Sequence, residues 1–332
     1  MAALDIWSPM RFLVTGADGF IGSHVVEALL AARPEWDVVA FVHRAATRWL
    51  QPDPAGRLAI VVGDASRSLD LERVVDVDAI INLVGMPNAA LCDQDPEAAR
   101  LANFQSAVNA LNLSAQQGQP ARVVIVSTAA LYGEVDYLPI TEDHPVEPKG
   151  QYTNTKLAAE LTAAAYARDS GVPSVIVRPF NIYGPRQADD FVVPTIVKQC
   201  LMGIELRLGD GRPVRNFTYV TDAADLLVRA AIAKGVGGNT INLGSRPVIS
   251  IEQLARKVVE MTGCGLEPVF DRGRFREADP TVHEMDPSLA ERLLGWRPLV
   301  PLEVGLARTI EHYRARLAEE RKEAARRMYG GA

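Results

Sequence analysis

Tyr152 and Lys156 are the residues of this sequence whose types and spacing most directly suggest acid–base chemistry. They stand four positions apart, which places both on one face of a helix that we predict to begin near Gln151. An ammonium stabilises a neighbouring phenolate, so Lys156 is expected to lower the pKa of Tyr152 toward working pH. Such a pair could move a proton on or off a substrate hydroxyl, although the same spacing is common by chance.

Two hydroxyl residues, Ser127 and Thr128, end a predicted strand that begins at Arg122. In α/β sheets, ligands bind at the edge formed by the carboxyl ends of the strands. At that edge, Thr128 can hydrogen-bond the substrate oxygen on which Tyr152 acts. The three residues would then exchange a proton with a hydroxyl while hydride passes between its carbon and a nicotinamide.

A glycine-rich turn near the N-terminus offers a place for such a cofactor. Residues 12–28 are typical of a short apolar strand, a turn with Gly16, Gly19 and Gly22, and a helix. Gly16 can leave the strand at positive φ, Gly19 lets the backbone approach a pyrophosphate, and Gly22 lets the helix pack closely. The phosphates would bind free N–H groups at the helix N-terminus. A plain structural turn is the alternative, and the strand and helix around the glycines favour dinucleotide binding.

The second predicted strand, from Asp37 to Arg44, bears on the type of dinucleotide. An acid at the end of this strand binds the ribose 2′-hydroxyl of NAD, whereas an arginine accommodates the 2′-phosphate of NADP. His43 and Arg44 occupy the end of the strand and no acid is present, which favours NADP. Alternatively, Arg44 is a solvated loop residue and NAD binds through other contacts.

Two further strand ends are predicted to meet the cofactor. Asp64 ends the third predicted strand, where it could contact the adenine edge or equally cap the following turn. The fourth predicted strand, from Ala79, ends at Leu83, Val84 and Gly85, where the middle of the cofactor would lie.

The alternation of strands and helices up to residue 178 predicts an α/β fold with a Rossmann-type doubly wound parallel sheet. Beyond it, short strands, loops and helices predict a smaller α/β C-terminal substrate domain. We therefore expect a dinucleotide-binding domain at 1–178 and a mainly substrate-binding domain at 179–332, some segments of which return to the sheet. A helix is predicted over 97–115, and the charged helix over 311–327 is predicted to be a solvated surface element.

Composition argues against several classes of function. With 48% hydrophobic and 23% charged residues, the chain is typical of a globular protein. A net charge of -6 argues against a surface that binds nucleic acid. Cys92, Cys200 and Cys264 lack metal-ligand spacing, so we predict neither a metal site nor a disulfide framework. No long apolar run or N-terminal signal pattern is present, so no membrane association and a cytoplasmic location are expected.

Several motifs together resemble the extended short-chain dehydrogenase/reductase family, in particular its nucleotide-sugar epimerase and dehydratase members. The resemblance covers nearly all of residues 11–313. The motifs are Thr15-Gly-Ala-Asp-Gly-Phe-Ile-Gly22, Ser127-Thr-Ala-Ala-Leu-Tyr-Gly133, Tyr152-Thr-Asn-Thr-Lys156, the run from Arg178 to Pro185, Arg215-Asn-Phe-Thr-Tyr-Val-Thr-Asp222 and Leu294-Gly-Trp-Arg-Pro298. They are highly specific for the family and much less so for the substrate.

The resemblance implies roles for individual residues. Thr128, Tyr152 and Lys156 would form the catalytic triad, and Asn103 matches a family asparagine near the cofactor. The implied substrate contacts are Thr128, Asn181, Arg215 and Arg276, the arginines being suited to a diphosphate as bidentate donors. Arg276 could also be a surface charge. The full set of predicted cofactor contacts is Gly16, Asp18, Gly19, Phe20, Ile21, Gly22, His43, Arg44, Asp64, Ala65, Leu83, Val84, Gly85, Asn103, Ser127, Tyr152, Lys156 and Pro179.

One departure from the family pattern narrows the activity. Family members that dehydrate or decarboxylate sugars place an acid, typically glutamate, three residues before the glycine of the strand-end motif. Here that position is Ala130, preceded by Ala129. Alanine cannot protonate a leaving hydroxyl, so a 4,6-dehydratase is disfavoured unless another acid such as Glu134 reaches the site.

These observations favour a redox-neutral nucleotide-sugar epimerase. Tyr152 would take a proton from a sugar hydroxyl as hydride passes to bound NAD(P)⁺, and hydride would return to the other face of the rotated keto sugar. The main alternative is an NADPH-dependent nucleotide-keto-sugar reductase, which Arg44 favours. A non-catalytic nucleotide-binding protein is a third, against which the presence of all three catalytic residues argues. The family also implies a homodimer through helices near 97–115 and 152–168.

Overall fold

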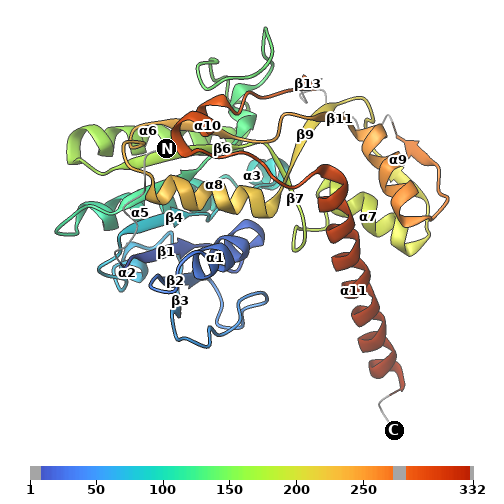
Figure 1. Ribbon diagram of the computed structural model, residues 1–332, viewed down its shortest axis with the longest axis horizontal. Coiled ribbons are helices and arrows are strands. Elements are labelled where there is room, and N and C mark those ends of the chain that lie inside the picture. The colour runs from blue at the N-terminus through green and yellow to red at the C-terminus, as the bar shows by residue number, and fades with distance from the viewer. Residues whose placement is uncertain (1–8, 272–281, 330–332) are drawn as a thin grey trace.

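Seven parallel strands form the central sheet of the computed structural model, which describes residues 9–271 and 282–329 (Figure 1). In spatial order they are β10–β6–β5–β4–β1–β2–β3. Their bounds are β1 (Arg11–Thr15), β2 (Asp37–Val42), β3 (Leu58–Val62), β4 (Ala79–Asn82), β5 (Arg122–Val126), β6 (Ser174–Pro179) and β10 (Thr240–Leu243). The order 3-2-1-4-5-6 is that of doubly wound nucleotide-binding sheets, so the predicted Rossmann-type fold is confirmed.

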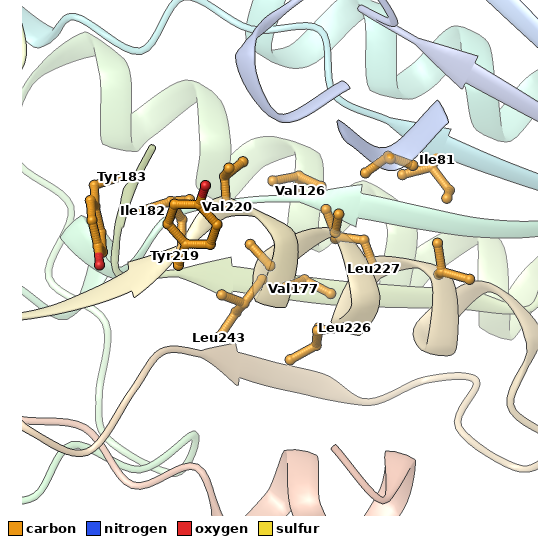
Figure 2. Packing of buried hydrophobic residues seen from close by; sticks show 14 of the residues in the cluster. Ile81, Val126, Val177, Ile182, Tyr183, Tyr219, Val220, Leu226, Leu227 and Leu243 are labelled. Carbon is orange, nitrogen blue, oxygen red and sulfur yellow. The ribbon is translucent and has the colours of Figure 1, made fainter. Parts of the chain in front are cut away.

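Both faces of this sheet are buried beneath helices. Side chains alternate along a strand, so Phe12 and Val14 of β1 enter one apolar cluster and Leu13 enters the other. The first face is covered by α1 (Phe20–Ala32) and α8 (Val220–Ile232), and the second by α5 (Ser106–Ala115) and α6 (Gly150–Ser170). Figure 2 shows Leu227 of α8 packed beside Val126 of the sheet. Each fully buried leucine or valine of this kind stabilises the fold by about 1.5–3 kcal/mol.

Chain beyond residue 178 builds a second layer and also completes the first sheet. Strand β10 pairs with β6, and α8 packs against α1. The two-domain division itself stays a prediction. The remaining elements are β7 (Asn181–Tyr183), β9 (Val214–Tyr219), β11 (Val248–Ser250) and β13 (Val282–His283) in one small sheet, β8 (Leu206–Leu208) and β12 (Pro268–Phe270) in another, and helices α7 (Val192–Met202), α9 (Ile251–Thr262) and α10 (Ser288–Leu294).

The C-terminal helix α11 (Leu302–Tyr329) is mainly exposed over residues 311–327, as predicted, but it begins nine residues before that segment. Its first half packs into the core through Leu306, Ile310 and Tyr313, all at most 3% exposed. The Tyr313 hydroxyl donates a hydrogen bond to the Gln187 carbonyl. Beyond these turns the helix projects from the body toward the C-terminus (Figure 1). The periodic apolar residues that anchor it lie mainly before Glu311, outside the segment on which the prediction rested.

The helix predicted over 97–115 is divided into three pieces. They are α4 (Pro96–Ala99), a π-helical segment η1 (Arg100–Gln105) and α5. Such π-helical turns are rare and often occur at functional sites. The described ranges also contain the short helices α2 (Ser68–Leu71) and α3 (Ala89–Gln94) and the 3₁₀ turn η2 (Ala129–Tyr132).

Across the described ranges, no helix combines the length and apolar character needed to cross a membrane. The same ranges hold no cluster of three or more histidine, cysteine, aspartate or glutamate side chains placed to bind a metal ion.

Candidate functional site

A cavity of about 940 Å³ opens at the carboxyl edge of the central sheet. It is bounded by the glycine-rich turn, the ends of β4 and β5, the start of α6, the chain after β7 and one face of α11. The structure brings thirteen of the predicted site residues into its wall. They are Gly16, Gly19, Phe20, Ile21, Gly22, Leu83, Gly85, Ser127, Thr128, Tyr152, Lys156, Pro179 and Asn181.

The glycine-rich turn has no room for side chains. Gly16 has a φ of +67°, and a Cβ on it would lie 3.1 Å from the backbone of Leu83. A Cβ on Gly22 would lie only 2.2 Å from the Gly16 carbonyl oxygen. Gly19 caps α1 without any side-chain hydrogen bond, which leaves N–H groups at the helix start for a ligand. These features fit a dinucleotide pyrophosphate.

Thr128 and Tyr152 meet inside the cavity. The Thr128 hydroxyl hydrogen-bonds the Tyr152 phenol oxygen and accepts the backbone N–H of Ala130 at 3.2 Å. Next to it, the Ser127 hydroxyl is 4% exposed and has no hydrogen-bond partner among the described residues. A buried hydroxyl without a partner costs about 1–3 kcal/mol, so Ser127 is suited to bind a ligand in the cavity.

Lys156 lies deeper in the wall than Tyr152. Its Nζ donates a hydrogen bond to the Val126 carbonyl oxygen at 2.9 Å, and a Cβ on Gly85 would lie 3.2 Å from that nitrogen. Burial lowers the pKa of Lys156 to about 8. Burial also raises the pKa of Tyr152, and the Thr128 hydrogen bond only opposes this. The predicted lowering of the Tyr152 pKa by Lys156 is therefore not found in this structure, because desolvation of the phenolate dominates.

Asn103 supports this pair from outside the cavity wall. Its Oδ1 accepts the Met86 N–H at 2.7 Å, and its Nδ2 donates to the Thr155 hydroxyl at 3.2 Å. Because Thr155 immediately precedes Lys156, Asn103 joins the loop after β4 to the helix that carries Tyr152 and Lys156. Asn103 lies in the π-helical segment η1, and from there its side-chain amide contacts both Met86 and Thr155.

The residues predicted to meet the adenosine end lie outside the cavity wall. His43 and Arg44 are exposed after β2. The Asp18 carboxylate accepts the backbone N–H groups of Arg48 and Trp49, both at 2.8 Å, and so folds the chain after β2 back onto the glycine turn. The structure thus shows a positioning role for Asp18.

Asp64 caps its own turn, one of the two alternatives left open by the sequence. Its carboxylate accepts the backbone N–H of Ser66 at 2.9 Å and the Ser66 hydroxyl at 2.8 Å. Ala65 is buried, and its carbonyl accepts the Asn109 side-chain amide at 2.9 Å. Val84 packs against the apolar cluster on the α5 face of the sheet. A role for these residues in cofactor binding stays a prediction.

The predicted substrate contacts are not all placed together. Asn181 lies in the cavity wall at the start of β7. Arg215 is 9% exposed within β9 and donates to the Val214 carbonyl at 2.9 Å, outside the wall. Arg276 falls outside the described residues. The contribution of Arg215 and Arg276 to diphosphate binding stays a prediction.

Residues 12–244 match the family model described as the NAD dependent epimerase/dehydratase family. The chain belongs to this family. The resemblance to the extended short-chain dehydrogenase/reductases is thereby confirmed, and with it the enzyme class.

The similar proteins span three activities. UDP-glucuronic acid decarboxylase 1 of Xenopus tropicalis is 32% identical, over 93% of this chain and 73% of the relative. GDP-6-deoxy-D-mannose reductase of Pseudomonas aeruginosa is 28% identical, over 93% of this chain and 99% of the relative. The solved UDP-glucuronic acid 4-epimerase of Bacillus cereus, in complex with UDP-glucuronic acid and NAD, is 28% identical over 92% of this chain and 99% of that chain, with a TM-score of 0.82. Identity at this level does not separate the activities.

One part of the cavity wall in this family member is charged, and the sequence analysis did not predict these charged residues. It includes Arg186, Asp189, Arg316 and Glu320. Arg316 donates to both carboxylate oxygens of Asp189 at 2.7 and 2.6 Å and pairs with Glu320 at 3.2 Å. Arg186 directly follows a recognised motif, which could have drawn attention to it. No sequence motif marked Arg316 as a site residue, because only the packing of α11 brings it to the cavity.

Arg186 is held in a constrained conformation. Its φ is +73°, in the left-handed region that non-glycine residues rarely adopt. Its Nη2 pairs with Glu27 of α1, while Nη1 is buried without a partner among the described residues. Its backbone N–H donates to His312 Nε2 at 3.3 Å. The neighbouring Gln187 Oε1 is likewise buried and without a partner in the part of the chain described.

No acid stands beside Tyr152 in the part of the cavity wall that the structure describes. Ala130 lines the wall at the position that the sequence analysis compared with the family's acid, and the exposed Glu134 does not line it. The carboxylates in the described wall, Asp189 and Glu320, are both paired with Arg316.

A buried ion pair fixes the turn that follows Thr128. Arg178 donates to the Glu160 carboxylate at 3.0 and 2.6 Å, and its guanidinium lies 4.9 Å from the centre of the Tyr132 ring. The Tyr132 hydroxyl in turn hydrogen-bonds Asn242 at 2.7 Å. Removing one partner of such a buried pair typically costs about 3–5 kcal/mol, so this network sets the geometry of η2.

Proposed function

We propose that this protein is a nucleotide-sugar epimerase that acts through a transient keto sugar. The observation that carries the proposal is the convergence of Thr128, Tyr152 and Lys156 on the cavity that also contains the glycine-rich turn. The absence of a carboxylate beside Tyr152 among the described residues supports epimerisation over dehydration or decarboxylation.

In this proposal the protein's own residues transfer the proton and position the sugar. Tyr152 takes the proton from a sugar hydroxyl, most simply at C4, and later returns it. Thr128 holds the same oxygen, and Lys156 supplies positive charge next to the pair. A nicotinamide held beside the glycine-rich turn would supply reversible hydride exchange with the sugar carbon. Ser127, whose buried hydroxyl has no partner among the residues described, is available to orient the bound molecules.

An NADPH-dependent reductase of nucleotide keto sugars is the second candidate. The observation in its favour is the absence of an acid at the end of β2, where His43 and Arg44 stand instead. Arg48, a few residues on, lines the cavity and adds a second cation on this side. Both arginines suit a 2′-phosphate, so we infer that NADP binds at least as well as NAD.

Two measurements on the purified protein test these proposals. Denaturation followed by mass spectrometry identifies any nucleotide that is released, and tightly held NAD(H) or NADP(H) near one per chain is expected for an epimerase. A panel of UDP-glucose, UDP-N-acetylglucosamine and UDP-glucuronic acid, without added cofactor, then identifies the epimer formed. A protein that releases no nucleotide and acts only with added NADPH would instead be the reductase.

We further propose a homodimer. Leu161 on α6 is 64% exposed, and Leu91 on the neighbouring α3 is 48% exposed, so apolar side chains face solvent beside the helices predicted to pair. Sedimentation should give twice the chain mass at micromolar concentration, and Leu161→Glu should shift the protein to monomer. A wild-type monomer would contradict the dimer. The cytoplasmic location stays a prediction from the sequence.

A further inference from the structure

Cys200 and Cys264 lie far apart in the sequence, but their side chains meet. Cys200 is near the end of α7, and Cys264 follows the end of α9. The two thiols are close enough for each to affect the pKa of the other. Both are free thiols, and neither belongs to the cavity described above.

The fold explains why the two thiols meet. Helices α7 and α9 each lead into a short strand, β8 and β12, and these strands pair in parallel with Leu206 opposite Pro268. Cys200 and Cys264 precede these two positions by six and four residues. The same strand pairing that aligns the two helix–strand units therefore brings the cysteines together.

The chain around Cys264 can adapt to a new bond. Cys264 stands between Gly263 and Gly265, which have φ values of +66° and +67°. These left-handed conformations cost glycine little, and nothing lies within 4 Å of a Cβ built on either residue. A disulfide needs an S–S distance of about 2.05 Å, and this loop can supply the small shift without disturbing the core.

The two sulfurs differ in reactivity. Cys200 is 3% exposed, and burial raises the pKa of its thiol to about 12. Cys264 is partly exposed. Burial tends to raise the pKa of its thiol, but hydrogen bonds from the Thr262 hydroxyl and the Leu266 N–H hold it below its ordinary value. Since the thiolate is the reactive form, Cys264 is the sulfur that an oxidant attacks first.

We propose that Cys200 and Cys264 form a redox modification site at which a peroxide closes a disulfide between α7 and the loop after α9. Hydrogen peroxide transfers one oxygen to the Cys264 thiolate, which gives a sulfenic acid and hydroxide. The Cys200 thiol then attacks that sulfur, so that the S–S bond forms and the S–O bond breaks with loss of water. Overall, two thiols lose two electrons and two protons, and the peroxide is reduced to two waters.

The bond would act on the substrate side of the cavity. Val192 and Val193, at the start of α7, line the cavity, and Cys200 lies two turns further along the same helix. A disulfide at Cys200 restricts movement of α7 relative to a nucleotide sugar bound in the cavity. We expect a several-fold rise in KM with unchanged bound cofactor, an expectation that rests on the proposed function.

Intact-protein mass spectrometry with thiol titration tests the site. Peroxide treatment of the reduced full-length protein should remove two hydrogen atoms and lower the free thiols from three to one. Peptide mapping should link residues 200 and 264, and dithiothreitol should reverse the change. Cys200→Ser and Cys264→Ser should each abolish it, whereas Cys92→Ala, as the matched control, should retain it.

Failure of this proposal is distinguishable from failure of the proposed function. A wild-type protein that gains only oxygen atoms, or a Cys264→Ser variant that still forms the bond, would overturn the disulfide site. A disulfide that leaves KM unchanged would overturn its link to the cavity. The mass and thiol readouts need no turnover, so a protein without epimerase activity would contradict the proposed function alone.

Discussion

The cavity has two walls that are built in different ways. One is the glycine wall, formed by the backbone of Gly16, Gly19 and Gly22, where an added Cβ would meet main-chain atoms. The other is the arginine wall, formed by Arg186, Asp189 and Arg316, whose side chains come from the loop after β7 and from α11. The glycine wall is formed by residues that are close together in the sequence. The arginine wall forms only when segments far apart in the sequence pack together.

This difference explains what could be predicted. Glycine spacing and a strand-to-helix change are local signals, so the fold and thirteen wall residues could be predicted from the sequence. Arg316 could not be predicted as a wall residue, because its segment has the charged composition of a solvated helix. Only the structure shows that Tyr313 is buried and that this part of α11 packs beside the cavity. The raised pKa of Tyr152 was also missed, since desolvation depends on the whole enclosure and not on the spacing to Lys156.

The largest effect should come from Tyr152, which lines the same cavity as both walls. Tyr152→Phe removes the acid/base and should lower kcat by about 10²–10⁴-fold, without loss of bound nucleotide. Tyr166→Phe on the same helix, whose hydroxyl bonds Asn112, is the control and should keep activity. Steady-state kinetics with nucleotide analysis of both variants checks this. Full activity of Tyr152→Phe would exclude the proposed mechanism.

A single Cβ added to the glycine wall should abolish cofactor binding. Gly22→Ala places a carbon 2.2 Å from the Gly16 carbonyl oxygen, so the turn must shift and cofactor content should fall to near zero. Gly118→Ala, where a Cβ meets nothing within 4 Å, should leave it unchanged. Nucleotide release and thermal melting compare the pair. A Gly22→Ala protein with full cofactor would show that the turn does not hold the pyrophosphate.

The arginine wall should respond in KM instead. Arg316→Met leaves Asp189 and Glu320 without their shared cation, and the added negative charge should repel an anionic nucleotide sugar. We expect a rise in KM of about tenfold, or about 1.4 kcal/mol, with cofactor content unchanged. Arg321→Met, exposed on the same helix, is the control. Equal KM values for the two variants would remove Arg316 from the substrate side.

A smaller effect should separate the two arginines after β2. Arg44 is exposed at the strand end, and Arg48 lines the cavity. If Arg44 reads the 2′-phosphate, Arg44→Gln should weaken NADP by about tenfold and leave NAD unchanged. Titration calorimetry of both single variants decides between them. An effect confined to Arg48→Gln would move the contact from the predicted residue to the cavity wall.

The smallest effect concerns pH. Burial, followed by Arg316 and Arg186, lowers the pKa of His312 below 6.5, and its Nε2 must be unprotonated to accept the Arg186 N–H. The contribution is complete above about pH 6.5 and is lost as pH falls toward the folded-state pKa, because the unfolded chain binds the proton first. The slope stays below about 1.4 kcal/mol per pH unit for one proton.

Denaturant unfolding from pH 7.5 to 5.5 measures this slope. His24 contributes with the same sign, because burial also lowers its pKa. His312→Gln should therefore reduce the slope without removing it. Stability that rises on acidification would contradict the assigned direction.

The most direct test of the epimerase proposal follows the hydrogen at C4. Purified protein is incubated in ordinary water, without added nucleotide, with UDP-glucose or UDP-glucuronic acid carrying deuterium at C4. The account predicts a C4 epimer that retains the deuterium, and no product with Tyr152→Phe. Deuterium lost to solvent, or turnover only with added NADPH, would contradict it.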